Sequence, residues 1–234
     1  MGSETALKLP VIDFSKEDLK PGSIEWNSVR SQVHQAVQQY GCFEALFDKL
    51  SLELRKQIFI NSEEFFNLPL ETKMKNVSKK PFHGYVGQYA MVPLYESVGI
   101  DDANIMEKVE DLTKTLWPQG NTSFSKTIQS FSKELAEFDR TIRRMILESF
   151  GLEKYLEEHT DSTNYLLRIA KYKEPKTTES KVGLHVHTDK NTITILYQNQ
   201  VDGLEIQTKD GEWIKTKPSQ DSFIAMVGDS FYVS

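Results

Sequence analysis

The dominant spacing of apolar residues changes near Asn164. Before that point, most apolar residues recur every three or four positions, which is the period of a helix with one buried face. After it, short β-branched runs alternate apolar and polar residues, and this period of two is typical of strands. Helices followed by strands predict an α+β protein in which an antiparallel sandwich or barrel shares a core with the helices.

The helical part divides at residues that end helices. The apolar spacing predicts helices that stop before Gly41, near Pro69 and before Pro118. The longest periodic segment begins after Asn121 and Ser123, the two candidate N-caps, and ends at Phe150-Gly151. Residues 76 to 100 show neither period, and we expect an irregular loop there.

Several short segments have the composition of strands. They are Leu9 to Phe14, Cys42 to Phe47, Leu166 to Tyr172, Thr192 to Tyr197, Leu204 to Gln207, Glu212 to Lys215 and Ser222 to Val227. Asp210-Gly211 is a hairpin signal, because glycine tolerates the positive φ that such turns need. The segment from Phe231 to Ser234 also has a strand-like composition. We expect the segment from Thr192 to Tyr197 to pair with the one from Ser222 to Val227. We expect Leu204 to Gln207 to pair with Glu212 to Lys215.

Composition excludes several classes of protein. With 234 residues, of which 38% are hydrophobic, the chain can bury a real core. A net charge of -6 argues against a nucleic-acid partner, which normally requires a basic surface. Its single cysteine, Cys42, cannot form an internal disulfide, and no run approaches the roughly 18 apolar residues of a membrane span. No targeting segment is evident at the start, so a cytoplasmic protein without a membrane partner is expected.

His187 and Asp189 are the candidate metal ligands. They are two residues apart, so on an extended strand both side chains would point to one side and could reach one metal. A non-haem iron centre of the facial-triad type needs two imidazoles and one carboxylate, with the opposite positions left open. Neither a His nor an Arg occurs between Asp189 and Ser234. The sequence therefore supplies two ligands of the three.

An alternative metal chemistry starts from His185. The series His185, His187 and Asp189 has the spacing of a His-x-His-x-Asp metallohydrolase motif, but Lys190 stands where that motif has its last His. Two further histidines, His34 and His159, lie in or near helices, where solvated or capping roles are expected.

Several motifs together resemble one family. They are Leu9 to Phe14, Tyr40-Gly41-Cys42-Phe43, Phe65-Phe66-Asn67-Leu68-Pro69 with Lys73, Gly183 to Gln198, Asp202-Gly203-Leu204-Glu205, Gly211-Glu212-Trp213-Ile214 and Gly228-Asp229. In these segments the chain resembles the plant 2-oxoglutarate and iron(II) dependent dioxygenases over nearly its whole length. Tyr85 to Tyr89 and Pro93 to Ser97 are most similar to the branch that modifies glucosinolate side chains and to a relative that oxidises auxin.

The resemblance implies a fold, cofactors and roles for particular residues. It implies a double-stranded β-helix, or jelly-roll, with N-terminal helices, and here an incomplete one. His187 and Asp189 would be the first two iron(II) ligands; the family's later His, and the Arg that holds the 2-oxoglutarate cosubstrate, have no counterpart before Ser234. A lysine cannot replace the planar, bidentate Arg at such a site. Tyr172 is a weak candidate for binding 2-oxoglutarate, and Lys173 replaces a Tyr that binds it in other members.

The resemblance also predicts an activity. Intact relatives would hydroxylate or desaturate a small plant metabolite, whereas this chain as given is expected to be inactive. The remaining alternatives are a non-catalytic remnant or partner-binding protein, and the metallohydrolase. We expect an N-terminal dioxygenase region over residues 1–120, a long packing helix and turn over 121–160, and the truncated catalytic core over 161–234. The aromatic residues Phe82, Tyr85, Tyr89 and Tyr95 would line a substrate mouth or simply pack on the barrel. Nothing in the sequence fixes the substrate or the oligomeric state.

Overall fold

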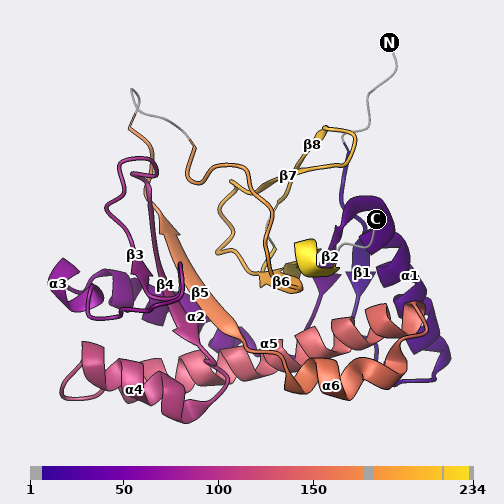
Figure 1. Ribbon diagram of the computed structural model, residues 1–234, viewed down its shortest axis with the longest axis horizontal. Helices are drawn as coiled ribbons and strands as arrows, with labels where there is room; N and C mark the ends of the chain where they lie inside the picture. The colour runs from indigo at the N-terminus through magenta and orange to yellow at the C-terminus, as the bar shows by residue number, and fades with distance from the viewer. Residues whose placement is uncertain (1–6, 177–181, 218, 232–234) are drawn as a thin grey trace. The chain divides into compact units, whose positions relative to one another are not determined.

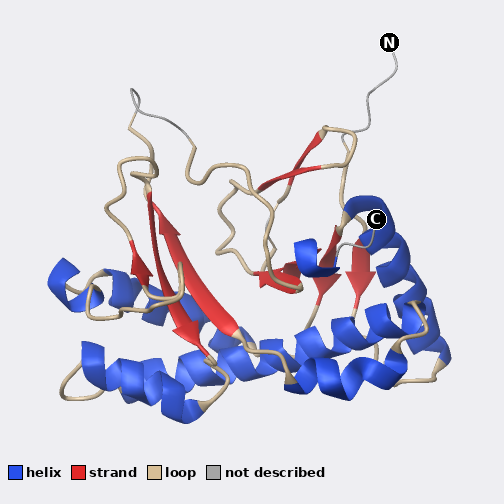
Figure 2. Cartoon of the chain, viewed as in Figure 1, coloured by secondary structure: helices blue, strands red, loops and turns tan. Residues whose placement is uncertain are grey.

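The computed structural model describes residues 7–176, 182–217 and 219–231, and these residues form a mixed helix and sheet protein (Figure 1 and Figure 2). The chain divides into two compact units, each described separately below. Unit 1 comprises residues 1–50, 137–161 and 188–234, and unit 2 comprises residues 51–136 and 162–187. Helix α5 (Thr122–Ser149) contributes residues to both.

Unit 1 is built on a four-stranded sheet in the order β1-β2-β9-β6. Its strands are β1 (Val11–Asp13), β2 (Cys42–Leu46), β9 (Ser222–Val227) and β6 (Ile193–Leu196). β1 runs parallel to β2, and the other two pairings are antiparallel. Helix α1 (Ile24–Tyr40) packs against β1 and β2 (Figure 1). It is capped by Ser23, which accepts a hydrogen bond from the Trp26 amide, and it ends at Gly41 with a φ of 71°.

An aromatic core joins the sheet of unit 1 to the C-terminal part of α5. The ring of Phe138 stacks on Phe47 at 4.2 Å and meets Phe14 edge-on at 5.0 Å. Phe223 of β9 stacks on Tyr197 at 4.6 Å. A second apolar cluster lies under the hairpin of β7 (Glu205–Gln207) and β8 (Trp213–Lys215), which pair in antiparallel register. Three short elements complete the unit: η1 (Glu153–Tyr155), α6 (Leu156–Asp161) and η2 (Asp229–Phe231).

Unit 2 contains a three-stranded antiparallel sheet in the order β3-β4-β5. Its elements are α2 (Leu52–Phe66), α3 (Leu70–Lys73), β3 (Tyr85–Val86), β4 (Tyr95–Asp101), α4 (Met106–Leu116), the first part of α5 and β5 (Leu166–Tyr172). Asn121 accepts a hydrogen bond from the Phe124 amide at 3.0 Å, which confirms it as the N-terminal cap of α5.

A buried ion pair joins α3 to β4 in unit 2. The ammonium of Lys73 lies 2.8 Å from the Glu96 carboxylate and also donates to the Phe66 carbonyl at 3.0 Å. The Tyr85 hydroxyl donates to the same carboxylate at 2.9 Å. Desolvation and the neighbouring Glu96 carboxylate raise the pKa of Tyr85 to about 12. Lys73, which the family resemblance singled out, therefore neutralises a buried acid.

The expected irregular loop over residues 76–100 is wrong at β3 and along β4, which form strands of one sheet. β4 is buried along nearly its whole length, so it shows no alternation of apolar and polar residues. Glu96 is tolerated there because Lys73 pairs with it. Gly99 is required because a Cβ at that position would lie 2.6 Å from the carbonyl oxygen of His83. Each of these residues weakened the strand signal.

The remaining predicted elements occur, with boundaries that differ by a few residues. Both expected pairings, β6 with β9 and β7 with β8, are confirmed. At the end of the chain, Phe231 belongs to the short helix η2 and not to a strand, and residues 232–234 lie outside the described part. Within the described residues, no helix is long and apolar enough to cross a membrane.

Candidate metal centre

His187 lies at the end of unit 2 in a segment that pairs with no strand. The sequence placed it on an extended strand, and this detail is wrong, because residues 185–189 take part in no ladder. The imidazole is exposed, and its Nδ1 lies 2.8 Å from the carbonyl oxygen of His185. Because a carbonyl only accepts, Nδ1 donates this hydrogen bond, and in the neutral tautomer the lone pair is then on Nε2. A metal-binding histidine has this arrangement, in which one ring nitrogen is fixed by a backbone carbonyl.

The segment leading to His187 packs against the end of β5. A Cβ on Gly183 would lie 2.5 Å from Cδ1 of Tyr172, so only glycine lets the chain pass this ring. The phenol of Tyr172 lies beside Tyr95 and keeps 53% of its surface exposed. Desolvation of the hydroxyl, with the Tyr95 phenol nearby, raises the pKa of Tyr172 to about 12. Like any phenol at neutral pH, Tyr172 is protonated and can donate a hydrogen bond.

Asp189 lies in unit 1, in the loop that precedes β6, and is partly buried. The Thr194 hydroxyl donates to Oδ2 of Asp189, and the Asn191 side-chain amide donates to the Thr194 hydroxyl at 2.9 Å. Thr194 belongs to β6, where it pairs in register with Met226. The candidate carboxylate is thus joined to a strand through a side-chain hydrogen bond.

A turn at the end of β9 closes this loop. The amides of Gly228, Asp229 and Ser230 donate to the carbonyls of Thr192, Asp189 and Asn191 at 2.9, 2.8 and 3.2 Å, respectively. Ser230 Oγ adds a hydrogen bond of 2.7 Å to the carbonyl of Lys190. The Asp229 carboxylate also accepts from Lys190 and Thr188, and these hydrogen bonds lower its pKa. Gly228-Asp229, noted in the sequence only as a family motif, therefore holds the Asp189 loop.

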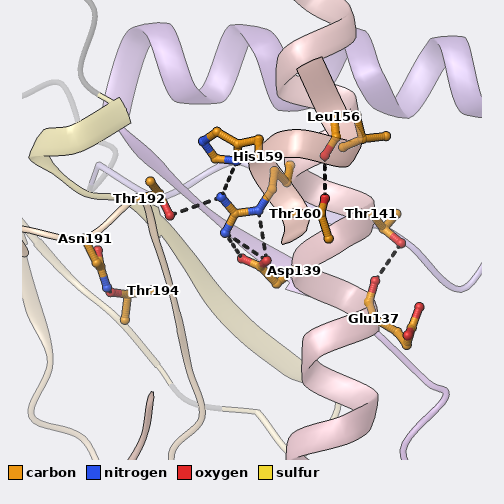
Figure 3. Close-up of polar contacts among 10 residues, drawn as sticks. Glu137, Asp139, Thr141, Leu156, His159, Thr160, Asn191, Thr192 and Thr194 are labelled. Carbon is orange, nitrogen blue, oxygen red and sulfur yellow. Dashed lines mark hydrogen bonds and ion pairs between the residues drawn. The ribbon is translucent and has the colours of Figure 1, made fainter. Parts of the chain in front are cut away.

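The Arg143 guanidinium lies beneath the same loop in a fully buried position. It makes three hydrogen bonds of 2.9–3.1 Å to the two carboxylate oxygens of Asp139, one turn earlier on α5. It also contacts Nδ1 of His159 at 2.9 Å and donates to the Thr192 hydroxyl at 3.2 Å (Figure 3). Arg143 thereby connects α5, α6 and the loop that carries Asp189.

The solvated or capping role expected for His159 is wrong. Its ring stacks on Phe231 at 5.4 Å and faces Arg143. Burial and the Arg143 charge lower the pKa of His159, although the Asp139 carboxylate acts in the opposite direction. The imidazole is therefore favoured in its neutral form, with Nδ1 as the acceptor. Sequence reasoning missed Arg143 as well, because the i, i+4 spacing of Asp139 and Arg143 is usually that of an exposed helix pair.

The remaining histidine and aromatic residues considered in the sequence differ in their burial. His34 packs its ring edge-on against Phe150 at 5.3 Å. Tyr95 is buried, whereas Phe82 and Tyr89 expose 62% and 58% of their surfaces. Across the described ranges, no three His, Cys, Asp or Glu side chains are grouped so that they could hold a metal ion.

Comparison with known proteins identifies the family. Residues 9–93 match the model of the non-haem dioxygenase in morphine synthesis N-terminal region, and residues 158–234 match that of the 2OG-Fe(II) oxygenase superfamily. A probable 2-oxoglutarate-dependent dioxygenase of Arabidopsis thaliana, AOP1.2, is 57% identical over 96% of this chain and 71% of its own length. The chain belongs to the 2-oxoglutarate and iron(II) dependent dioxygenase family.

Further relatives agree with this assignment. AOP2 of Arabidopsis thaliana, described as a probable inactive 2-oxoglutarate-dependent dioxygenase, is 36% identical, covering 98% of this chain and 78% of its own. Among solved structures, the Arabidopsis thaliana dioxygenase for auxin oxidation 1 with 2-oxoglutarate superposes with a TM-score of 0.83, at 23% identity, over 95% of this chain and 80% of that one. The α+β fold of a double-stranded β-helix dioxygenase is thereby confirmed. Iron(II) is the family's cofactor and 2-oxoglutarate its cosubstrate, and its members act on plant metabolites.

Proposed function

We propose that His187 and Asp189 are two of the three protein ligands to iron(II) in a dioxygenase site that hydroxylates or desaturates a small plant metabolite. The observation that carries this proposal is the polar support of each ligand. The Nδ1 of His187 is held by a backbone carbonyl, and Oδ2 of Asp189 is held by Thr194. Such outer partners are typical of metal ligands, because they fix the orientation of the donor atom.

The donor set suits iron(II). One imidazole and one carboxylate belong to the facial arrangement of non-haem iron oxygenases, in which iron(II), when bound, activates oxygen at positions that the protein leaves open. In this arrangement His187 would offer Nε2, and Asp189 would supply the negative charge. Tyr172, whose phenol is protonated at neutral pH, would donate a hydrogen bond to a carboxylate of 2-oxoglutarate.

The 234-residue polypeptide by itself would bind iron weakly and turn over little 2-oxoglutarate. Between Asp189 and Ser234 it supplies neither a second imidazole nor an Arg. Two ligands leave most of an octahedral shell to water, and a lysine such as Lys215 lacks the planar fork that binds a carboxylate through two parallel hydrogen bonds. Catalysis by this site would need both missing groups.

Succinate formation from 2-oxoglutarate tests the proposal. Three proteins are compared: the 234-residue chain, the same chain fused to a segment that carries the family's later His and Arg, and that fusion with His187→Ala. We expect iron-dependent succinate only from the unsubstituted fusion. Succinate from the 234-residue chain above that of its own His187→Ala, Asp189→Ala double variant would contradict the proposed incompleteness. An active fusion that keeps its activity after His187→Ala would contradict the ligand assignment.

A second candidate function is a protein that binds without turnover. The observation that favours it is the similarity to a relative described as a probable inactive 2-oxoglutarate-dependent dioxygenase. A chain of this kind would bind 2-oxoglutarate or a partner, yet form no succinate even with iron in excess. No contact among the described residues favours the metallohydrolase, whose last His is replaced by Lys190.

A further inference from the structure

The Thr194 hydroxyl occupies a position between a side-chain amide and a carboxylate. Nδ2 of Asn191 can only donate, so Oγ1 of Thr194 must accept the 2.9 Å hydrogen bond. An ionised carboxylate can only accept, so the hydroxyl proton of Thr194 must be directed to Oδ2 of Asp189. The direction of both hydrogen bonds is therefore set by the chemistry of the outer two groups.

This series of bonds links a loop to a strand. Thr194 lies in β6, and its neighbours Ile193 and Ile195 pair with Val227 and Ala225 of β9. Asp189 lies in the preceding loop, which has no ladder pairing of its own. A hydrogen bond from a fixed strand residue restricts the rotation of the Asp189 carboxylate, and rotamer freedom is what a metal ligand must otherwise lose on binding.

The loop is also held at its other end. The Arg143 guanidinium donates to the Thr192 hydroxyl, and the Gly228 amide donates to the Thr192 carbonyl. Asn191, whose side chain donates to Thr194, is also held through its backbone: its carbonyl accepts a hydrogen bond from the Ser230 amide. The backbone between Asp189 and Thr194 thus has contacts on both sides, which hold the side chains of Asn191, Thr194 and Asp189 within hydrogen-bonding distance.

We propose that Thr194 is a positioning residue, supported by Asn191, that sets the Asp189 carboxylate for a divalent metal ion. This inference rests on the proposed function, because it assumes that Asp189 is a metal ligand. Thr194 does not touch the metal itself. Its removal should weaken metal binding by about tenfold, as observed for outer-shell partners of metal ligands, without a matching loss of fold stability.

The test is titration of the 234-residue chain with Mn(II), followed by the paramagnetic broadening of the Asp189 amide signal in NMR spectra. This signal reports even weak binding, and it does not depend on turnover. Thr194→Val keeps the β-branched shape and removes the hydroxyl, whereas Thr194→Ser keeps the hydroxyl. The matched control is Thr141→Val, because within the described part of the chain the Thr141 hydroxyl donates to the Glu137 carbonyl of its own helix and to no other group (Figure 3).

We expect Thr194→Val to need about ten times more Mn(II) for half-broadening, and Thr194→Ser to remain within about twofold of the unchanged chain. Thr141→Val should match the unchanged chain, and thermal melting should show all these variants folded. If Thr194→Val does not fold, Asn191→Ala provides the second variant, with an expected loss of severalfold. Equal Mn(II) requirements for Thr194→Val and the unchanged chain would overturn the inference.

An Asp189→Ala variant separates this inference from the proposed function. If Asp189→Ala lowers Mn(II) binding while Thr194→Val does not, Asp189 is a ligand and only the positioning role is wrong. If Asp189→Ala binds Mn(II) as the unchanged chain does, the ligand assignment fails and the inference fails with it.

Discussion

Replacement of Gly228 by alanine tests whether the turn after β9 holds the Asp189 loop. A Cβ at this position would lie 2.3 Å from the carbonyl oxygen of Asn191, 2.5 Å from its side-chain Oδ1 and 2.8 Å from the carbonyl oxygen of Asp189. Two of these three atoms are backbone atoms, so a change of rotamer cannot relieve the clash. The loop and the turn must separate by several tenths of an ångström or more.

The magnitude follows from the hydrogen bonds that this movement breaks. Three amides and one hydroxyl of residues 228–230 donate across the interface. Loss of two to four of them, at about 1 kcal/mol each, gives a destabilisation of about 2–4 kcal/mol. The matched control is Gly120→Ala, where a Cβ would meet no atom within 4 Å but φ is +81°. That control should lose only about 1–2 kcal/mol through backbone strain.

Urea denaturation of the two variants and the unchanged chain provides the measurement, with unfolding free energies compared at constant m. Gly228→Ala should also increase amide exchange at Asp189 and Asn191, whereas Gly120→Ala should leave both rates unchanged. A loss below 1 kcal/mol for Gly228→Ala, with unaltered exchange in the loop, would refute the role given to the turn.

Two further predictions concern the Arg143 cluster. Arg143→Met should cost about 3–5 kcal/mol in denaturant melts, because it leaves the Asp139 carboxylate buried without its cation, whereas a cost below 1 kcal/mol would refute this. The pKa of His159 is lowered from its usual 6.5, so the neutral ring stabilises the fold above that pH. As pH falls from about 6.5 towards the lowered pKa, the unfolded state binds a proton that the folded state does not yet bind. The stabilising contribution should therefore be lost across this pH window. Thermal melts of His159→Gln should depend less on pH in that window, and an unchanged slope would contradict the assignment.

The elements that sequence reasoning predicted are those specified by local signals. The α1 helix has a serine cap, an apolar stripe and a C-terminal glycine within one segment of the chain. The β7-β8 hairpin has Gly211 at a φ of 86° in its turn. Strand β4 was missed because its stability depends on partners distant in sequence: Lys73 for Glu96, and the 7-residue pairing with β5 for its backbone.

The candidate site shows the same contrast between local sequence signals and contacts between distant segments. His187 and Asp189 could be proposed as ligands from the sequence because a two-residue spacing and the surrounding motif lie in one stretch of the chain. The support given by Arg143 to Thr192 spans 49 residues, and the Gly228 turn joins segments from β9 and the β6 loop. Such contacts have no local pattern, because each side chain could equally face solvent until the fold places it.

Anaerobic titration with iron(II) tests the central claim, that His187 and Asp189 form an incomplete ligand pair. It compares the 234-residue chain, the chain extended by a segment with the family's later His, and the extended chain with His187→Ala. The account predicts weak binding by the first, binding at least about tenfold tighter by the second, and loss of that gain in the third. If the 234-residue chain binds iron(II) as tightly as the extended one, then His185 or another group already completes the site, and the claim is wrong.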